Sequence, residues 1–450
     1  MTKSDDATHD ATHDAAIERL APPPGVLEIA RRLERAGYET WCVGGAVRDA
    51  LLGHPQLDWD LATAAEPEQV RRVFRRTVPI GVEFGTIGVL DADGEMHEVT
   101  TFRRDVRTDG RHAVVEFGAS LDDDLARRDF TINAIAYSPE RRVLHDPFGG
   151  RHDLVRGVVR AVGDPSTRLT EDRLRALRAI RFAGRFNFTI DETTWAAIVD
   201  SAPHLVRLSA ERVREELEKT MQQLSRPSLA LERWRASGAL AVLVPELAEA
   251  QPERFATADC LPLPTLATRP QRLSLRLASL WLDADPAVVE QALRRLRASN
   301  ARVRETSELA ARWLRLAEPM RDALLAAAPP TDATIRRWAA STGRTRLPML
   351  LRLAAARFAA ERAFGEVAPD EARLRGVYRR AVRIAYRDPI EVADLAVSGS
   401  DLLTLPGVRG PLVGELLRRL LERVVDDPAT NTRDALLSIA RDLSPTLDRG

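Results

Sequence analysis

The stretch Val43–Thr63, VGGAVRDALLGHPQLDWDLAT, combines a double glycine, an arginine and an Asp-Trp-Asp segment. Its Leu57–Leu61 part predicts a strand, in which side chains alternate between two faces, so the apolar residues point inward together. Asp58 and Asp60 then project side by side from the opposite face. Two carboxylates this close repel each other unless a cation lies between them, and Mg²⁺ prefers such oxygen ligands. The stretch therefore predicts a metal site at Asp58 and Asp60.

The double glycine lies between a predicted strand, Thr40–Val43, and a predicted helix, Ala46–Leu52. Glycines at this place let the backbone approach a ligand closely, and the start of a helix presents N–H groups to an anion. Arg48 adds a charged fork suited to phosphate. Gly44, Gly45 and Arg48 therefore predict a triphosphate site beside the metal.

The order of these features is more specific than each feature alone, because a double glycine is usually only a turn and a lone D-x-D is usually a solvated strand face. In the order GG-x-x-RD-x-LLG…D-x-D they resemble motif A of the class II nucleotidyltransferases, the family of bacterial CCA-adding enzymes and poly(A) polymerases. The resemblance implies an α/β nucleotidyltransferase palm, a polymerase-β-like mixed sheet with helices, followed by an all-α arm of neck, body and tail. It also implies template-independent addition of C, C and A to the 3′ end of tRNA, with CTP and ATP as substrates and Mg²⁺ as cofactor.

Further along the chain, Phe84–Leu90 and Met96–Phe102 predict two strands joined by an Asp-Gly turn within Asp91–Glu95. Glu98 lies in the middle of the second strand, where an exposed edge position would explain it without any function. If that strand lies beside the Asp-Trp-Asp strand, Glu98 is a third carboxylate for a two-metal arrangement. The family has such a residue in this motif, written here as HEVTTFR.

The next segment, Arg103–Asp124, is polar and poorly periodic, and it predicts a mobile loop. The resemblance assigns such a loop to addition of the final A.

The segment Asp124–Ala134 predicts a strand face from its alternating apolar residues. A surface ion pair would explain its polar residues, but the segment resembles the RRDxxxNA motif of the family. That motif implies that Arg128 contacts the triphosphate, with Asp129 and Asn133 nearer the sugar or its support.

From Thr170 the sequence predicts a helix, with Asp172, Arg175, Arg178 and Arg181 at every third position. The i, i+3 spacing puts Asp172 and Arg175 on one helix face. A carboxylate complementing the helix dipole and solvated arginines would explain these residues without a function. The run E-D-x-x-R-x-x-R-x-x-R-F, however, resembles the helix with which the family selects the incoming base, which implies that all four residues bind the nucleotide.

Motifs become sparser beyond this helix. Ser209–Lys219 resembles the S-x-E-R…E…K motif of the family, in which Arg212 would brace the base-selecting helix, and Val397–Gly414 resembles its glycine-rich C-terminal element, suited to a phosphodiester backbone. We therefore expect a disordered tail (1–20), a catalytic palm or head (21–150), a helical neck (151–222), a helical body (223–370) and a tRNA-binding helical tail (371–450).

The amino-acid composition of the whole chain excludes few classes of function. The 450 residues include 66 basic and 66 acidic residues, so no net charge points to nucleic acid, although a local basic patch would suffice. Cys42 and Cys260 have no metal-binding spacing. No apolar run approaches the length of a membrane span, so we expect a cytoplasmic enzyme that uses no membrane. The oligomeric state stays open.

Alternative functions are poly(A) synthesis, addition of only CC or only A, and RNA binding without catalysis. Bacterial poly(A) polymerases carry a G-R-R-F-R-L-A-H-like segment, where this chain has PIGVEFGT at Pro79–Thr86, and they tend to have a long basic C-terminal extension. Half-enzymes that add only CC or only A stay possible. A non-catalytic RNA-binding protein on the same scaffold would be favoured by loss of the D-x-D, which is intact.

Overall fold

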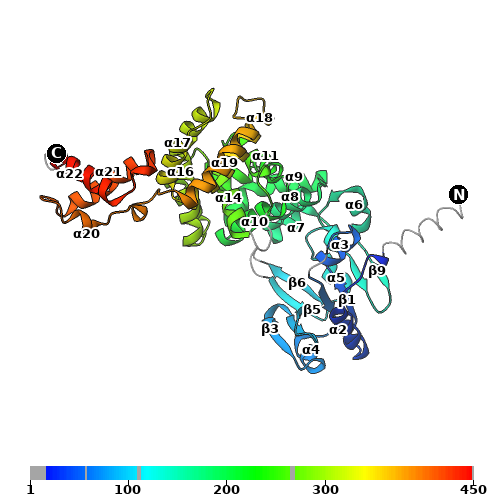
Figure 1. Cartoon of the computed structure of the whole chain (residues 1–450). Coiled ribbons are helices and arrows are strands. Elements are labelled where there is room, and N and C mark those ends of the chain that lie inside the picture. The colour runs from blue at the N-terminus through cyan, green and yellow to red at the C-terminus, as the bar shows by residue number, and fades with distance from the viewer. Residues whose placement is uncertain (1–16, 56–57, 109–112, 264–268, 448–450) are drawn as a thin grey trace. The chain divides into compact units, whose positions relative to one another are not determined.

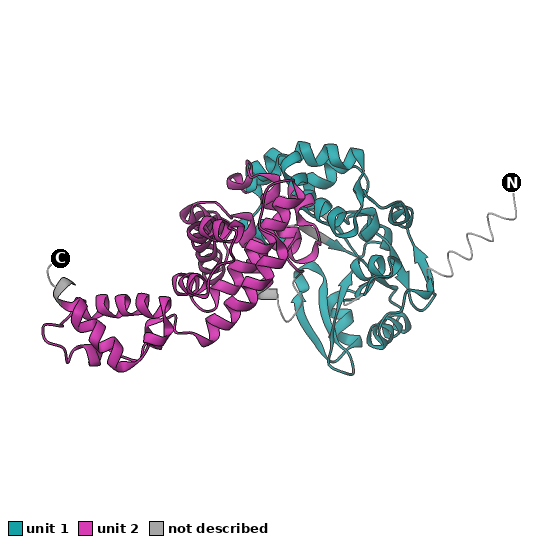
Figure 2. Ribbon diagram, turned by 45° about the horizontal axis from the view of Figure 1, so that its top comes forward, with its two compact units in different colours: residues 1–216, 232–243 teal, residues 217–231, 244–450 magenta. Residues whose placement is uncertain are grey.

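The computed structural model describes residues 17–55, 58–108, 113–263 and 269–447. The chain forms two compact units (Figure 2): residues 1–216 with 232–243, here unit 1, and residues 217–231 with 244–450, here unit 2. Among the described helices, none combines the length and the apolar character needed to cross a membrane.

Unit 1 contains a mixed sheet with the strand order β3-β4-β5-β2-β1-β8-β9 (Figure 1). Strand β2 pairs in parallel with β5 and antiparallel with β1, and the other neighbouring pairs are antiparallel. The sheet is therefore mixed, as predicted. Its strands are β1 (Thr40–Val43), β2 (Asp60–Thr63), β3 (Thr77–Gly81), β4 (Thr86–Leu90), β5 (Met96–Thr101), β8 (Ala136–Ser138) and β9 (Val143–His145).

Helices pack on both faces of this sheet. On one face, α2 (Pro24–Arg35) contacts β1, β2 and α4 (Pro67–Val73), and it buries a stripe of apolar residues at helical spacing that begins at Val26. On the other face, Trp41 and Ala62 pack against α5 (Leu121–Ala126). The side chains of the central strands are thus divided between two packed layers.

The rest of unit 1 is mostly helical. It comprises α3 (Gly45–Leu51), η1 (Val82–Phe84), β6 (Arg103–Thr108), β7 (Ala113–Phe117), η2 (Thr131–Asn133), α6 (Gly150–Arg156), β10 (Val158–Val159), α7 (Pro165–Glu171), α8 (Leu174–Phe186), β11 (Thr189–Ile190), α9 (Glu192–Ser201), η3 (Ala202–Arg207), the first half of α10 (Ala210–Gln223), the second half of α11 (Pro227–Ala236), and α12 (Ala239–Leu243).

Unit 2 is helical throughout its described residues, as predicted for the arm. Its larger core lies among α14, α16, α17, α18 and α19, and a smaller core lies among α20, α21 and α22. The elements are η4 (Pro245–Leu247), α13 (Pro252–Asp259), α14 (Arg269–Leu280), α15 (Pro286–Arg295), α16 (Asn300–Leu325), α17 (Asp332–Thr342), α18 (Arg346–Ala363), α19 (Glu371–Arg387), η5 (Val392–Asp394), α20 (Gly399–Leu402), α21 (Pro411–Asp426), η6 (Pro428–Thr430) and α22 (Arg433–Leu447).

The prediction of an irregular loop at Arg103–Asp124 is wrong for most of that segment. β6 and β7 form an antiparallel ribbon in which Arg103 pairs with Phe117, and an ion pair of 2.8 Å joins Arg104 to Glu116. Ser120 then caps α5 by accepting a hydrogen bond from the Asp123 backbone N–H. Charged side chains do not prevent such a ribbon where they are exposed, as Arg104 and Glu116 are.

Two local predictions in the following segments are also wrong. Phe130, Ile132 and Ala134 are buried, but Thr131–Asn133 form the 3₁₀ turn η2 rather than a strand. The predicted helix from Thr170 begins earlier and is broken: Asp164 caps α7, the chain is extended at Asp172, and α8 starts at Leu174. Asp172 therefore does not share a helix face with Arg175.

The ends of two predicted segments also differ. Ile17 and Leu20 are buried, so the described part of the predicted tail 1–20 belongs to unit 1, whereas residues 1–16 lie outside the described residues. Leu57, predicted to point inward, lies outside them too. In unit 2, part of the loop predicted at Gln251–Gln271 is the helix α13.

Candidate active site

The Asp-Trp-Asp segment leads into β2. Trp59 is 3% exposed and lies under the sheet, whereas Asp58 is exposed just before the strand and Asp60 is its first residue. Burial first, and then the negative charges of Asp58 and Glu98, raise the pKa of Asp60 to about 6 against the opposing charge of Arg128. The three carboxylates are therefore close enough to repel one another.

The sheet register explains why Glu98 joins the two aspartates. Leu61 of β2 pairs with Val99 of β5 in the parallel ladder. Asp60 and Glu98 each precede one member of this pair, so both side chains point to the same face. The prediction that the Glu98 strand lies beside the Asp-Trp-Asp strand is confirmed.

Gly44 borders these carboxylates. It precedes α3 with φ of 77°, a conformation that favours glycine. A Cβ atom at this position would lie 3.0 Å from Nη1 of Arg128 and 3.8 Å from Oδ2 of Asp60. Gly44 thus leaves open the space between a guanidinium group and a carboxylate. A Cβ on Gly45 would meet Nη2 of Arg48 at 3.6 Å.

Arg48 is buried and has protein partners, and its predicted contact with a phosphate stays a prediction. Its side chain is 4% exposed, its Nε donates to Asp49 Oδ1 over 2.8 Å, and its Nη1 donates to Asn133 Oδ1 over 2.5 Å. The guanidinium group also lies over the rings of Phe182 and Phe186 of α8, 5.0 Å and 4.8 Å from their centroids. Arg48 therefore ties α3 to α8, and this geometry argues against direct contact with a phosphate.

The three polar residues of the RRDxxxNA segment separate into two groups. Arg128 faces the carboxylates and forms an ion pair of 3.2 Å with Asp124. Asp129 and Asn133 point the other way. Oδ1 of Asp129 accepts from Asn133 Nδ2 over 2.8 Å, and its Oδ2 accepts from Arg178 Nη2 over 2.7 Å. Arg128 is thus placed for a ligand, and the other two residues support the site.

Asp172 and Arg175 lie at the junction of α7 and α8. Oδ2 of Asp172 forms an ion pair of 2.7 Å with Arg212, which confirms that Arg212 braces this region. Arg175 donates to Glu171 Oε2 over 2.9 Å and to the Arg127 carbonyl oxygen over 2.9 Å. Both predicted base-selecting residues therefore have protein partners.

The last two arginines of the series bind protein carboxylates. Arg178 is paired with Asp129, as described above, and Arg181 is paired with Glu216 in the interior, where their side chains are 5% and 1% exposed. These contacts attach α8 to the head on one side and to α10 on the other. They favour a supporting role over the predicted contact with the nucleotide.

The comparisons with known proteins agree with this geometry. A family model described as "Poly A polymerase head domain" matches residues 40–160, and one described as "Probable RNA and SrmB- binding site of polymerase A" matches residues 187–251. The CCA-adding enzyme of Limosilactobacillus reuteri (strain DSM 20016) is 33% identical over 432 residues, which span 94% of this chain and 98% of that protein. The chain belongs to the family of bacterial CCA-adding enzymes and poly(A) polymerases.

Two other members of the CCA-adding family show where the likeness extends. The CCA-adding enzyme of Leuconostoc mesenteroides is 48% identical over 195 residues, which span 43% of this chain and 48% of that protein. The crystal structure of the Bacillus stearothermophilus CCA-adding enzyme in complex with CTP is 31% identical, has a TM-score of 0.74, and covers 95% of this chain and 100% of that one. The predicted fold class is confirmed.

A divalent metal suits both the CCA-adding family and the residues present. Asp58, Asp60 and Glu98 supply oxygen ligands, and their mutual repulsion is relieved when a cation lies among them. A second group, Asp91, Glu95 and His97, brings its ligand atoms within 4.8 Å of one another at the turn between β4 and β5. There a hydrogen bond of 3.0 Å between Asp91 and His97 accounts for the arrangement without a metal.

Several residues in the network of contacts around Arg48 were not predicted from the sequence. Asp49 forms ion pairs with Arg48 and with Arg185 of α8, the latter over 2.9 Å. Phe182 and Phe186 provide the aromatic surface for Arg48. The i, i+4 spacing of these aromatic residues is a signal for a packed helix face, but it does not identify an arginine in a distant segment as the partner.

Asp129→Asn should remove a pH-dependent part of the stability of unit 1. Burial raises the pKa of Asp129, but Arg178 and Asn133 lower it more strongly, to about 2. Because this pKa is below the unfolded value, the stability it contributes is present above about pH 4 and is lost as pH falls toward 2, a total of about 2 kcal/mol. Urea unfolding should show that the gap between wild type and variant shrinks by about 1 kcal/mol between pH 7 and pH 3.

The control for this measurement is Asp200→Asn on α9, an exposed carboxylate. Its effect on the free energy of unfolding should be small at both pH values. An Asp129→Asn gap that does not change with pH would contradict the assignment.

Proposed function

We propose that this chain adds C, C and A to the 3′ end of tRNA without a nucleic-acid template, using CTP and ATP and releasing pyrophosphate. The observation that carries the proposal is the convergence of Asp58, Asp60 and Glu98 on one sheet face, beside Gly44 and Arg128. Likeness to CCA-adding enzymes over 94% of the chain supports it. Because its substrate is tRNA, we expect the protein to act in the cytoplasm.

Mg²⁺ is the proposed cofactor, held by Asp58 and Asp60 with Glu98 beside them. When bound, it would lower the pKa of the attacking 3′-hydroxyl group and stabilise charge on the leaving pyrophosphate. The protein residues orient the reactants. Arg128 faces the carboxylates across Gly44, where its guanidinium group can hold the triphosphate.

Asp172 and Arg175 are the proposed base-selecting pair. Arg175 offers only hydrogen-bond donors, and ionised Asp172 offers only acceptors. Cytosine and adenine both present an exocyclic amino donor beside a ring-nitrogen acceptor, and guanine and uracil present the reverse pattern. One residue pair therefore accepts C and A and rejects G and U. To contact a base, the two side chains must exchange their present partners, Arg212 and Glu171.

Replacing Asp172 and Arg175 together by alanine should relax nucleotide choice toward UTP and GTP, because discrimination of about 1–3 kcal/mol per bidentate contact is lost. Incorporation of all four nucleotides into tRNA measures this. Arg173→Ala, on the same segment, is the matched control and should leave selection unchanged. An active double variant that still refuses UTP and GTP would place base selection elsewhere.

Shortening the ribbon of β6 and β7 should leave addition of C intact and selectively impair the terminal A. The ribbon begins directly after β5, whose Glu98 belongs to the candidate site. Replacing residues 106–114 by a two-residue Asn-Gly turn keeps Asp105 opposite Val115, and with it the pairing of Arg103 with Phe117 at the base of the ribbon. The separate rates of C and A addition are the measurement. An equal fall in both would assign the ribbon to general folding or tRNA binding.

The competing functions are poly(A) synthesis and addition of only CC or only A. The purified protein should be given tRNA that ends at the discriminator base, with CTP alone, ATP alone, and both. Completion of CCA with both nucleotides supports the proposal. Long A tracts with ATP alone would identify a poly(A) polymerase, and products that stop at CC would identify a half-enzyme.

A further inference from the structure

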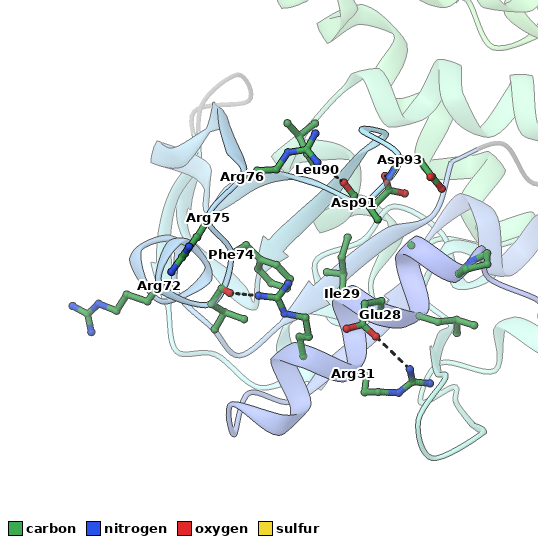
Figure 3. A pocket seen from close by; sticks show the side chains of 16 residues that line it. Glu28, Ile29, Arg31, Arg72, Phe74, Arg75, Arg76, Leu90, Asp91 and Asp93 are labelled. Carbon is green, nitrogen blue, oxygen red and sulfur yellow. Dashed lines mark hydrogen bonds and ion pairs between the residues drawn. The ribbon is translucent and has the colours of Figure 1, made fainter.

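A cavity of about 850 Å³ lies in unit 1, and its lining includes Asp91 of the second acidic group described above (Figure 3). Its walls come from α2, from the segment that joins α4 to β3, and from the turn that joins β4 to β5. None of the proposed catalytic or base-selecting residues lines it. Its size falls within the range of small-molecule binding sites, about 300–1,000 Å³.

The cavity lies on the reverse face of the sheet from the catalytic carboxylates. Asp60 and Glu98 share their face with Ala62, which packs toward α5. His97 precedes Glu98 and so points to the opposite face. There its Nε2 lies 3.0 Å from Oδ2 of Asp91, which lines the cavity. A ligand in this cavity is therefore separate from the nucleotide at the active site.

Positive charge exceeds negative charge in the lining. Arg31 pairs with Glu28 over 3.3 Å. The Asp91 carboxylate already accepts hydrogen bonds from the backbone N–H groups of Asp93 and Glu95, as well as contacting His97. The charged residues that line the cavity are Arg31, Arg32, Arg72, Arg75, Arg76, Glu28, Asp91 and Asp93.

The other four arginines have no carboxylate partner in the described part of the chain. Arg32 donates to the Val73 carbonyl oxygen and lies 4.4 Å from the Phe74 ring centroid. Arg76 donates to a carbonyl oxygen of the β4–β5 turn over 3.0 Å. Arg72 and Arg75 are exposed, and no described residue forms a hydrogen bond or ion pair with either side chain.

Guanidinium groups without carboxylate partners suit phosphate, which they contact through paired N–H···O bonds. Leu27, Val73 and Leu90 add an apolar surface that suits a base or a sugar. We propose that this cavity is a second phosphate-binding site of the head, which holds the phosphate groups of a nucleotide or of an RNA strand. The proposal does not depend on the reaction that the chain catalyses.

The test uses the full chain with Arg72 and Arg75 both replaced by glutamate. Both side chains are exposed, so the thermal unfolding temperature should not change; Arg72→Gln with Arg75→Gln serves as a milder second variant. Arg156→Glu, at an exposed position on α6 away from the cavity, is the matched control. One experimental arm measures binding of tRNA that lacks its CCA end over a range of salt concentrations. The other counts ATP molecules bound per chain by equilibrium dialysis.

If RNA is the ligand, the double variant should bind tRNA on the order of tenfold more weakly, and the slope of log affinity against log salt should fall by about 2. If a nucleotide is the ligand, ATP bound per chain should fall by one equivalent while the active site still fills. A change in either arm, absent in Arg156→Glu, supports the proposal and names the source of the phosphate. No change in both arms, or an equal change in the control, would overturn it.

Discussion

Asp60→Ala should abolish nucleotide addition, lowering kcat by about 10³-fold or more, and Asp58→Ala should do the same. The reason is that each variant loses an oxygen ligand of the proposed metal site, whose stabilisation of the transition state is worth several kcal/mol, or about 4 kcal/mol for a factor of 10³. Binding of tRNA should stay nearly unchanged. Asp200→Asn, an exposed carboxylate on α9, is the matched control and should keep full activity.

A second substitution at the same position, Asp60→Asn, should raise the free energy of unfolding, which separates lost chemistry from lost folding. Burial and the neighbouring carboxylates raise the pKa of Asp60 to about 6, above its usual 3.8. Its ionisation therefore costs stability as pH rises through about 6. Asp60→Asn should be more stable than wild type by about 2–3 kcal/mol at pH 7.5 in the presence of a chelator. Activity above a few per cent of wild type in either alanine variant would refute the metal-ligand assignment.

Arg181→Ala should destabilise unit 1 by about 3–5 kcal/mol, the largest effect expected away from the carboxylates. Arg181 and Glu216 form an ion pair in the interior, and removal of Arg181 takes the opposite charge of this pair away from the buried Glu216 carboxylate. Burial also lowers the pKa of Arg181, which shows the desolvation that the pair must offset. Urea unfolding, followed by circular dichroism, measures the loss.

Arg71→Ala is the control for this loss, because Arg71 forms an exposed i, i+3 pair with Glu68 whose removal should cost no more than about 0.5 kcal/mol. Arg181→Met combined with Glu216→Leu should recover most of the stability, since apolar side chains of similar volume remove both buried charges. A cost for Arg181→Ala no greater than that for Arg71→Ala would contradict the supporting role of the pair.

The grouping of the three carboxylates was predictable because it depends on short-range regularities. Trp59 is buried and Asp58 exposed as predicted, although β2 begins at Asp60 and not at Leu57, and the Asp-Gly turn makes the Glu98 strand one arm of a hairpin. Only the pairing of β2 with β5 was left for the structure to reveal, since strand order depends on the whole sheet.

Differences from the sequence-based expectations arise where distant contacts override local patterns. Arg48 follows a double glycine, as a phosphate ligand would, but its burial depends on Phe182 and Phe186, which lie far along the chain. Thr170 is an acceptable helix cap, yet Asp164 followed by Pro165 starts a helix earlier, and the chain is then extended at Asp172. The β6–β7 ribbon depends on backbone pairing between residues such as Arg103 and Phe117, which the polar, poorly periodic composition of the segment does not reveal.

The central claim, that this chain completes CCA, is tested most directly by sequencing the 3′ ends it makes. Three tRNA substrates are needed, ending at the discriminator base, after the first C and after the second C, each incubated with CTP and ATP together. The account predicts that all three converge on a single product ending in CCA, with no further addition. Ends that stop at CC, a substrate extended only after the second C, or heterogeneous A tracts would contradict it.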